Sequence, residues 1–138
     1  MDATRASAPR PAVLLSCTPG AAARALISVL EKSGYRVIVV HTEDEALDAL
    51  ETAAVDLILV HLQSVDPARL DFVKLQRMSD PIDPLLPVLV LADATDARLE
   101  QACADARVDL RLTSPIEARS LLDHIAGLCA GRLGKPRG

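Results

Sequence analysis

Three side chains suited to catalysis or metal binding stand where predicted strands end. Cys17 follows the apolar run that begins at Ala12, and His41 and His61 close the runs that begin at Val37 and Leu57. Reacting groups collect at the carboxyl ends of parallel strands, so chemistry is expected at these positions. A thiolate and two imidazoles are suitable ligands for Zn²⁺ or copper, completed by water or Thr42. No two of the three have a short local spacing, so a chance arrangement without metal is the alternative.

The elements that position these residues alternate along the chain. Apolar runs predict strands over residues 12–15, 37–40, 57–60, 88–91 and 110–112, and helical spacing predicts a helix after each of them. The run from Leu57 to Val60 has no polar alternation, which is typical of a strand buried on both faces. Strands that alternate with helices predict one α/β domain, a (βα)5 fold with a parallel sheet between two helical layers.

Several local signals place the helix ends. Thr42 followed by Glu45 predicts a capping box, and Thr95 or Asp96 is expected to cap the helix before the fifth strand. Asp66 and Pro67 are typical of another helix start.

Composition sets the limits of the domain. Half of the 138 residues are hydrophobic but only 1% are aromatic, so the core must consist of aliphatic side chains. We expect a flexible leader over residues 1–11, a folded domain over 12–130 and a flexible basic tail over 131–138. The net charge of −4 predicts no direct DNA binding, and no apolar run is long enough for a membrane helix. Three cysteines without a signal segment indicate reduced thiols in a cytoplasmic protein.

Five short segments together resemble the receiver domain of response regulators, the CheY-like superfamily, over nearly all of residues 12–128. They are Gly34-Tyr35-Arg36-Val37, Glu45-Ala46-Leu47, Asp56-Leu57-Ile58-Leu59, Pro87-Val88-Leu89-Val90-Leu91 and Leu112-Thr113-Ser114-Pro115. The resemblance implies a flavodoxin-like fold with strand order 2-1-3-4-5 and a role in bacterial-type two-component signalling. It also implies a cis peptide bond between Ser114 and Pro115, although Ser114, Pro115 and Glu117 by themselves are typical of an ordinary trans helix start.

The residues that take part in the phosphorylation of a receiver are replaced in this chain. The resemblance places Ser16 and Cys17 at the two acids that bind Mg²⁺, His61 at the phosphoaccepting aspartate, Ala92 at the Ser or Thr, Ser114 at the lysine and Arg111 at the switch aromatic. Mg²⁺ requires oxygen ligands, and phosphoryl transfer requires cations that neutralise charge. We therefore expect a degenerate pseudo-receiver that is not an enzyme, has no Mg²⁺ cofactor and acts by protein–protein interaction.

His61 has two interpretations at this position. Histidines accept phosphoryl groups in other signalling domains, but such a group would need cationic stabilisation. The alternative is an imidazole that fills the former acid pocket and forms a hydrogen bond with a backbone group.

Arginines mark the region from the fourth helix to the fifth, which is the interaction face of receivers. They are Arg98, Arg107, Arg111 and Arg119. This face is expected to bind a histidine kinase, an output domain, another regulator or a second copy of the chain, with Arg111 pointing outward at its centre. Arginines also suit the phosphates of a cyclic dinucleotide such as cyclic di-GMP, so a small-ligand sensor is the second hypothesis. Ion pairs with Asp96, Glu100 and Asp105 on a solvated face are the alternative to both.

Overall fold

A five-stranded parallel sheet organises the computed structural model of the chain, which describes residues 11–63, 67–78, 86–94 and 96–133. The strand order is β2-β1-β3-β4-β5, as the sequence predicts. The strands are β1 (Ala12–Ser16), β2 (Arg36–Val40), β3 (Leu57–Leu62), β4 (Val88–Ala92) and β5 (Leu110–Thr113). The helices are α2 (Ala21–Lys32), α3 (Glu43–Thr52), the 3-10 helix η1 (Pro67–Leu70), α4 (Asp71–Met78), α5 (Ala97–Asp105) and α6 (Ala118–Leu133).

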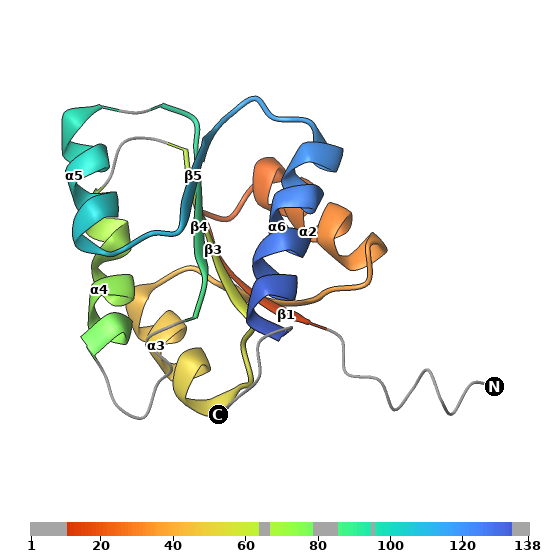
Figure 1. The fold of residues 1–138 in the computed structure, drawn as a ribbon, viewed down its shortest axis with the longest axis horizontal. Helices are drawn as coiled ribbons and strands as arrows, with labels where there is room; N and C mark the ends of the chain where they lie inside the picture. The colour runs from red at the N-terminus through yellow and green to blue at the C-terminus, as the bar shows by residue number, and fades with distance from the viewer. Residues whose placement is uncertain (1–10, 64–66, 79–85, 95, 134–138) are drawn as a thin grey trace.

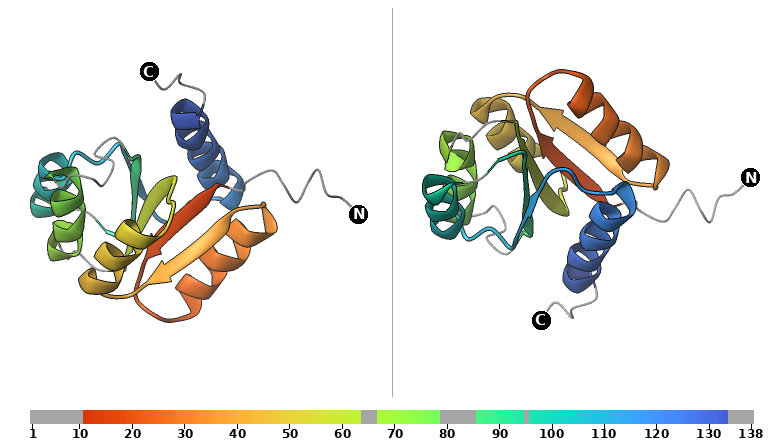
Figure 2. Two further views of the ribbon diagram at one scale, coloured as in Figure 1. Left: turned by 90° about the horizontal axis from the view of Figure 1, so that it is seen from below. Right: turned by 90° about the horizontal axis from the view of Figure 1, so that it is seen from above.

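Helices cover both faces of the sheet. Figure 1 shows α3, α4 and α5 on one side of the strands and α2 and α6 on the other, and Figure 2 shows the same layers from below and above. Side chains alternate along β3, so Ile58, Val60 and Leu62 enter the core beneath α3–α5. Leu57 and Leu59 enter the core beneath α2 and α6. Every residue of β1, β3 and β4 is buried, as expected for central strands of a parallel sheet.

Two of the predicted helix caps are present. The Thr42 hydroxyl accepts a hydrogen bond from the Glu45 backbone N–H at 3.1 Å, and the Glu45 carboxylate accepts from the His41 backbone N–H at 2.7 Å. Asp96 caps α5 by accepting from the Leu99 N–H at 3.0 Å. The other two residues named as caps, Thr95 and Asp66, lie outside the described residues.

Some boundaries differ from the predicted ones. β3 extends to Leu62, so His61 lies within the strand and not after it. The helix after β3 is divided into η1 and α4. α6 begins only at Ala118 and continues to Leu133, beyond residue 130 where the folded region was expected to end. The Ser114–Pro115 peptide bond is cis, as the resemblance implies.

The buried side chain of Arg77, on α4, binds the segments that lead into β4 and β5. The Arg77 side chain is 7% exposed and donates to the backbone carbonyls of Leu86 at 2.6 Å, Arg107 at 2.8 Å and Ala106 at 3.3 Å. It also pairs with Asp109 at 3.2 Å, and Asp109 accepts from the Val88 N–H at 2.7 Å. One guanidinium therefore connects α4 with the segments that lead into β4 and β5. We call these contacts the Arg77 clamp.

In the part of the chain that the structure describes, no helix is long and apolar enough to cross a membrane.

Candidate functional site

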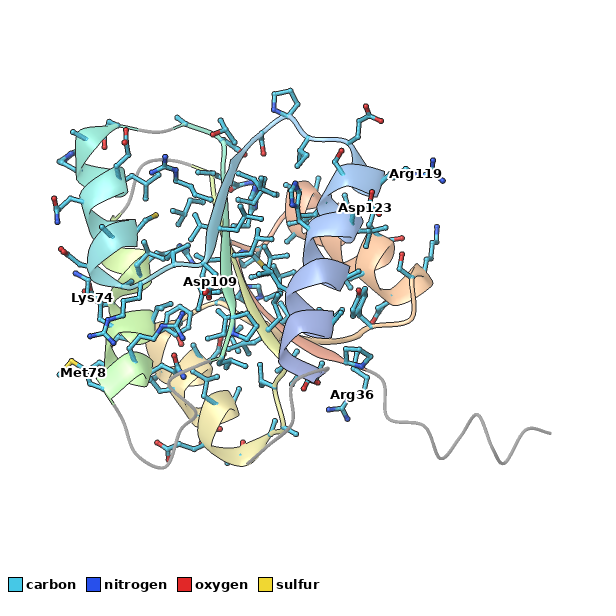
Figure 3. All side chains as sticks on the ribbon, viewed as in Figure 1. Arg36, Lys74, Met78, Asp109, Arg119 and Asp123 are labelled. Carbon is cyan, nitrogen blue, oxygen red and sulfur yellow. The ribbon has the colours of Figure 1, made fainter. Side chains whose placement is uncertain are left out.

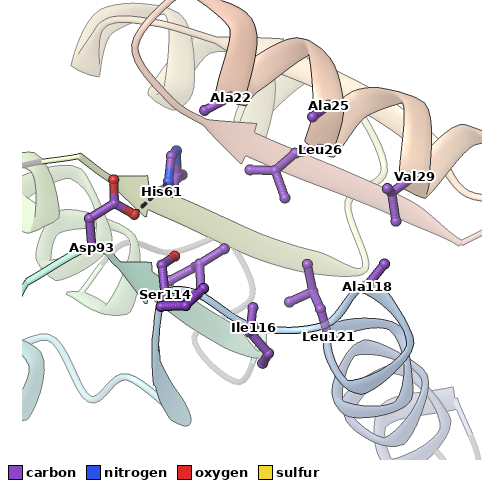
Figure 4. Close-up of a pocket in the computed structure, with 12 residues that line it drawn as sticks. Ala22, Ala25, Leu26, Val29, His61, Asp93, Ser114, Ile116, Ala118 and Leu121 are labelled. Carbon is purple, nitrogen blue, oxygen red and sulfur yellow. Dashed lines mark hydrogen bonds and ion pairs between the residues drawn. The ribbon is translucent and has the colours of Figure 1, made fainter.

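His61 is buried near the carboxyl end of β3. It lies opposite Leu91 in the register with β4, and Leu57 and Leu59, which share its side of β3, pack beneath α2 and α6. The residue is 4% exposed. Its Nε2 lies 3.3 Å from Oδ1 of Asp93, the residue that follows β4 (Figure 4). The prediction that His61 forms a hydrogen bond with a backbone group is therefore wrong, because the imidazole is paired with a carboxylate.

The contact with Asp93 determines which nitrogen of the His61 imidazole carries a proton. A carboxylate accepts hydrogen bonds only, so Nε2 must carry the proton that it donates to Asp93. His61 Nδ1 is buried and has no hydrogen-bond partner among the described residues. Asp93 is 42% exposed, so its carboxylate connects the buried imidazole with the surface.

A cavity of about 300 Å³ lies beside this pair, between α2 and α6. His61, Asp93 and Ser114 form its polar end, as Figure 4 shows. The rest of the lining is apolar and consists of Ala22, Ala25, Leu26, Val29, Leu91, Pro115, Ile116, Ala118 and Leu121.

The proposed metal ligands are not brought together around one point. His41 Nδ1 lies 2.7 Å from the Cys17 backbone oxygen, so that ring nitrogen donates to a carbonyl. His61 is turned to Asp93. Within the described residues, no group of three or more His, Cys, Asp or Glu side chains could hold a metal ion. The three strands are adjacent, as the strand order requires, but their terminal side chains form separate contacts.

Cys17 directly follows β1 and is buried. Burial raises the pKa of its thiol, and the nearby Arg69 guanidinium opposes that rise. The thiol therefore stays protonated near neutral pH and has little nucleophilic character. Cys103 is buried in the core beneath α3–α5, and Cys129 is buried in the core beneath α2 and α6.

Arg69 joins the 3-10 helix η1 to the loop after β1, at the carboxyl edge of the sheet. From η1 its guanidinium donates to the Thr18 hydroxyl at 3.0 Å, in the loop after β1. A second cavity, of about 220 Å³, lies on the α3–α4 side of this edge. Its lining is Ser16, His41, Thr42, Glu43, Ala68, Arg69 and Phe72. The residues at the two expected acid positions thus lie beside a fixed cation.

The end of β4 offers no hydroxyl group. Ala92 is fully buried, and its carbonyl accepts from the Ser114 N–H at 2.8 Å. Ser114 lines the cavity beside His61. An uncharged serine therefore stands where the resemblance would place a lysine.

The four arginines of the expected interaction face are spread over the molecule. Arg111 lies on the edge strand β5 and pairs with Glu100 at 3.9 Å, with its side chain 38% exposed. Arg98 pairs with Asp96 at 3.3 Å. Arg107 precedes β5, and Figure 3 shows Arg119 on α6 directed away from the α5 side. Two of the three acids that were expected as ion-pair partners, Asp96 and Glu100, therefore pair with arginines, whereas Asp105 accepts a hydrogen bond from Gln101.

Sequence reasoning missed Asp93 and Arg69. Asp93 could have been noticed as an acid directly after a buried strand, at the same edge as His61. Arg69 has no such signal, because its contact with Thr18 spans 51 residues.

Comparisons with known proteins show what this chain is similar to. No protein-family model matches the chain. The sensory/regulatory protein RpfC of Xanthomonas campestris pv. campestris is 31% identical over 101 residues, in each of two strains. This match covers 72% of the chain but only 14% of RpfC, so the chain spans about one seventh of the curated relatives it matches.

Solved structures match over more of the chain. A CheY-like response regulator receiver domain protein of Methanospirillum hungatei has a TM-score of 0.80, with 17% identity, and the match covers 93% of this chain and all of that one. The chain has a receiver-domain fold. The receiver domain of a Syntrophus aciditrophicus signal transduction histidine kinase has a TM-score of 0.76, with 21% identity, over 88% of this chain and 91% of the other. These matches confirm the resemblance that the five sequence segments indicate.

One receiver-domain structure gives a direct contrast in side chains. The receiver domain of the sensor histidine kinase PA1611 from Pseudomonas aeruginosa matches with a TM-score of 0.76 and 18% identity, over 88% of this chain and 99% of the other. Its structure has a magnesium ion coordinated in the active-site cleft. At the corresponding edge of the present receiver fold, the resemblance places Ser16 and Cys17 at the acid positions.

Proposed function

We propose that this chain is a phosphorylation-independent signalling module with a receiver fold, that it is not an enzyme, and that it acts through protein partners in a two-component-type system. The receiver structures of the comparison include domains of histidine kinases, and the curated relative is a sensory/regulatory protein. These similarities support a protein partner in signalling. The proposal adds that binding to this partner needs no phosphoryl group.

The observation that carries the proposal is the buried pair of His61 and Asp93. The position that would accept the phosphoryl group holds an imidazole that is 4% exposed and already donates to a carboxylate. A phosphoryl group on this ring would be placed beside the negative charge of Asp93. Repulsion between like charges opposes such a product, because the interaction is strong in a partly desolvated site.

The surroundings of the pair also oppose a magnesium cofactor. Mg²⁺ binds through carboxylates and water, whereas Ser16 offers a hydroxyl and Cys17 a buried thiol that stays protonated. The Arg69 guanidinium stands near Cys17 and repels a dication. We therefore propose that the module works without Mg²⁺.

We place the partner surface on α5, β5 and α6, with Arg111 at its centre. Arg111 belongs to the edge strand β5, and its half-exposed side chain lies against Glu100 of α5. An arginine that is held by a neighbouring acid but still exposed is a suitable anchor for an interface. Neither a metal site nor a cyclic-dinucleotide site has comparable support, because the candidate residues form other contacts.

The Arg111→Ala variant tests this surface. We expect it to weaken self-association, or binding to a kinase or regulator partner, by about 2 kcal/mol, which is about 30-fold in Kd. The melting temperature should change little, since the Arg111–Glu100 pair is exposed and long at 3.9 Å. Sedimentation velocity over a concentration series measures self-association, and calorimetry measures the binding of a partner.

Arg36→Ala is the matched control. Arg36 is exposed on β2, the opposite edge strand, so its loss should leave association unchanged. Full association of the Arg111→Ala variant, or an equal loss in both variants, would remove the support for this surface.

A further inference from the structure

We infer that the cavity between α2 and α6 is a binding site for a small primary amine with an apolar body, whose ammonium group pairs with Asp93. This ligand would give the module a chemical input at the position where other receivers are phosphorylated. The inference extends beyond the proposed function and does not depend on the partner surface.

Small side chains on two helices create the cavity. Ala22, Ala25, Leu26 and Val29 recur at intervals of three and four residues, so one face of α2 lines it. Ala118 and Leu121 of α6 lie opposite, and methyl groups on both sides leave space where larger side chains would meet (Figure 4). The volume of about 300 Å³ is at the lower end of the range for small-molecule sites. A whole helix is about 10 Å across and would not fit into it.

One end of the cavity is polar and rich in acceptors. The Asp93 carboxylate is 42% exposed, and within the described residues only its Oδ1 has a partner among side chains. The Ser114 hydroxyl lies at the same end. His61 also lines this end, and its Nε2 is the ring atom paired with Asp93.

Charge decides which head group fits. The lining includes the Asp93 carboxylate but neither lysine nor arginine. An ammonium group would form a charge-assisted hydrogen bond with the free carboxylate oxygen, whereas a carboxylate ligand would be repelled. The apolar walls would bury a hydrocarbon body and remove it from water. A cationic head with a short apolar body is therefore the matching class.

Three probes with one benzylic skeleton test the inference: 2-phenylethylamine, 2-phenylethanol and phenylacetate. Each is titrated into the ¹⁵N-labelled full chain, and amide shifts are followed in heteronuclear correlation spectra. We expect saturable shifts at Leu26, Asp93 and Ile116 with the amine. The alcohol should bind about ten-fold more weakly, since a neutral hydrogen bond replaces a charged one. Phenylacetate should not bind.

Two variants separate the head group from the body. Asp93→Asn keeps an acceptor for His61 but removes the charge, so it should lower affinity for the amine about ten-fold and change that for the alcohol little. Ala25→Leu fills the cavity from α2 and should abolish the binding of both. Ala21→Leu is the control, because Ala21 is exposed on the same helix and does not line the cavity.

Several results would overturn the inference. They are the absence of saturable shifts up to the solubility limit of the amine, preferred binding of phenylacetate, and unchanged amine binding in the Ala25→Leu variant. Binding of an amphipathic helical peptide without binding of the amine would assign this face to a protein partner instead. Melting curves and spectra of the unliganded variants establish that each is folded before its affinity is compared.

Discussion

His61 shows how a single residue redirects the chemistry of a strand end. An aspartate at this position would offer a free oxygen, whereas the imidazole is buried and donates to Asp93. The proton on Nε2 serves this contact, and the remaining nitrogen is enclosed. The same backbone position thus supports a polar contact inside the domain, and on the proposed function it does not accept a phosphoryl group.

Asp96 couples the stability of α5 to pH. The Leu99 backbone N–H, together with Arg98, lowers the pKa of this carboxyl below its ordinary value. A carboxyl with a lowered pKa in the folded state stabilises that state above its unfolded pKa, near 3.9, and loses this contribution as the pH falls through the folded pKa. Asp96→Asn keeps a capping oxygen but removes the charge. We expect wild type to be the more stable near neutral pH, and the difference to shrink on acidification below about pH 4.

Urea unfolding of both proteins across this pH range measures the difference. Effects of pH that wild type and variant share cancel in the comparison. Parallel loss of stability in wild type and variant would show that the Asp96 charge does not contribute.

The sequence predicts the strands and helices more completely than it predicts the side-chain contacts at their ends. The apolar runs and the Thr42–Glu45 box predict the strands, α2 and α3 because these signals are local. The end of β3 was placed too early, since hydrogen bonds to β4 carry the strand through His61 to Leu62. Periodicity along one segment does not contain this information.

The contacts that define the site are remote in sequence. His61 and Asp93 are separated by 32 residues, and Arg69 and Thr18 by 51. Each contact depends on the side chain's direction at the end of an element, which a shift of one residue reverses in a strand. The sequence therefore indicated which positions are altered, but not what replaces their contacts.

The Arg77 clamp is an element-scale contact whose loss should be costly. Arg77→Met keeps most of the side-chain volume but leaves the carbonyls of Leu86, Ala106 and Arg107 without this donor. We expect the free energy of unfolding to fall by about 2–4 kcal/mol, because hydrogen bonds from a charged, buried group are lost. Chemical denaturation monitored by circular dichroism measures the change.

Arg98→Met is the control for the clamp. Arg98 has an exposed pair with Asp96, with 74% of its side chain accessible, so this variant should change stability by less than about 0.5 kcal/mol. Arg77→Lys should recover little, since an ammonium group lacks the planar fork that reaches several acceptors. A small effect of Arg77→Met would show that the three segments are held together by their apolar packing alone.

At the scale of the whole molecule, the chain has a receiver fold, and the side chains at its carboxyl edge differ from those that the resemblance implies for a phosphorylated receiver. The sheet order and both helical layers correspond to receiver domains of known structure. At the edge itself, Arg69 lies near Cys17, the imidazole of His61 is paired, and Ala92 is buried. On the proposed function these features act in the same direction, because each would oppose Mg²⁺ binding or phosphoryl transfer.

Intact-mass spectrometry after incubation with Mg²⁺ and acetyl phosphate or phosphoramidate tests the central claim most directly. A phosphorylatable receiver treated in parallel shows that the donor is active and that the modification survives the measurement. We predict that the mass of this chain stays unchanged, with no population heavier by one phosphoryl group. A stable phosphoryl adduct that depends on Mg²⁺ and disappears in a His61→Gln or Asp93→Asn variant would contradict the account.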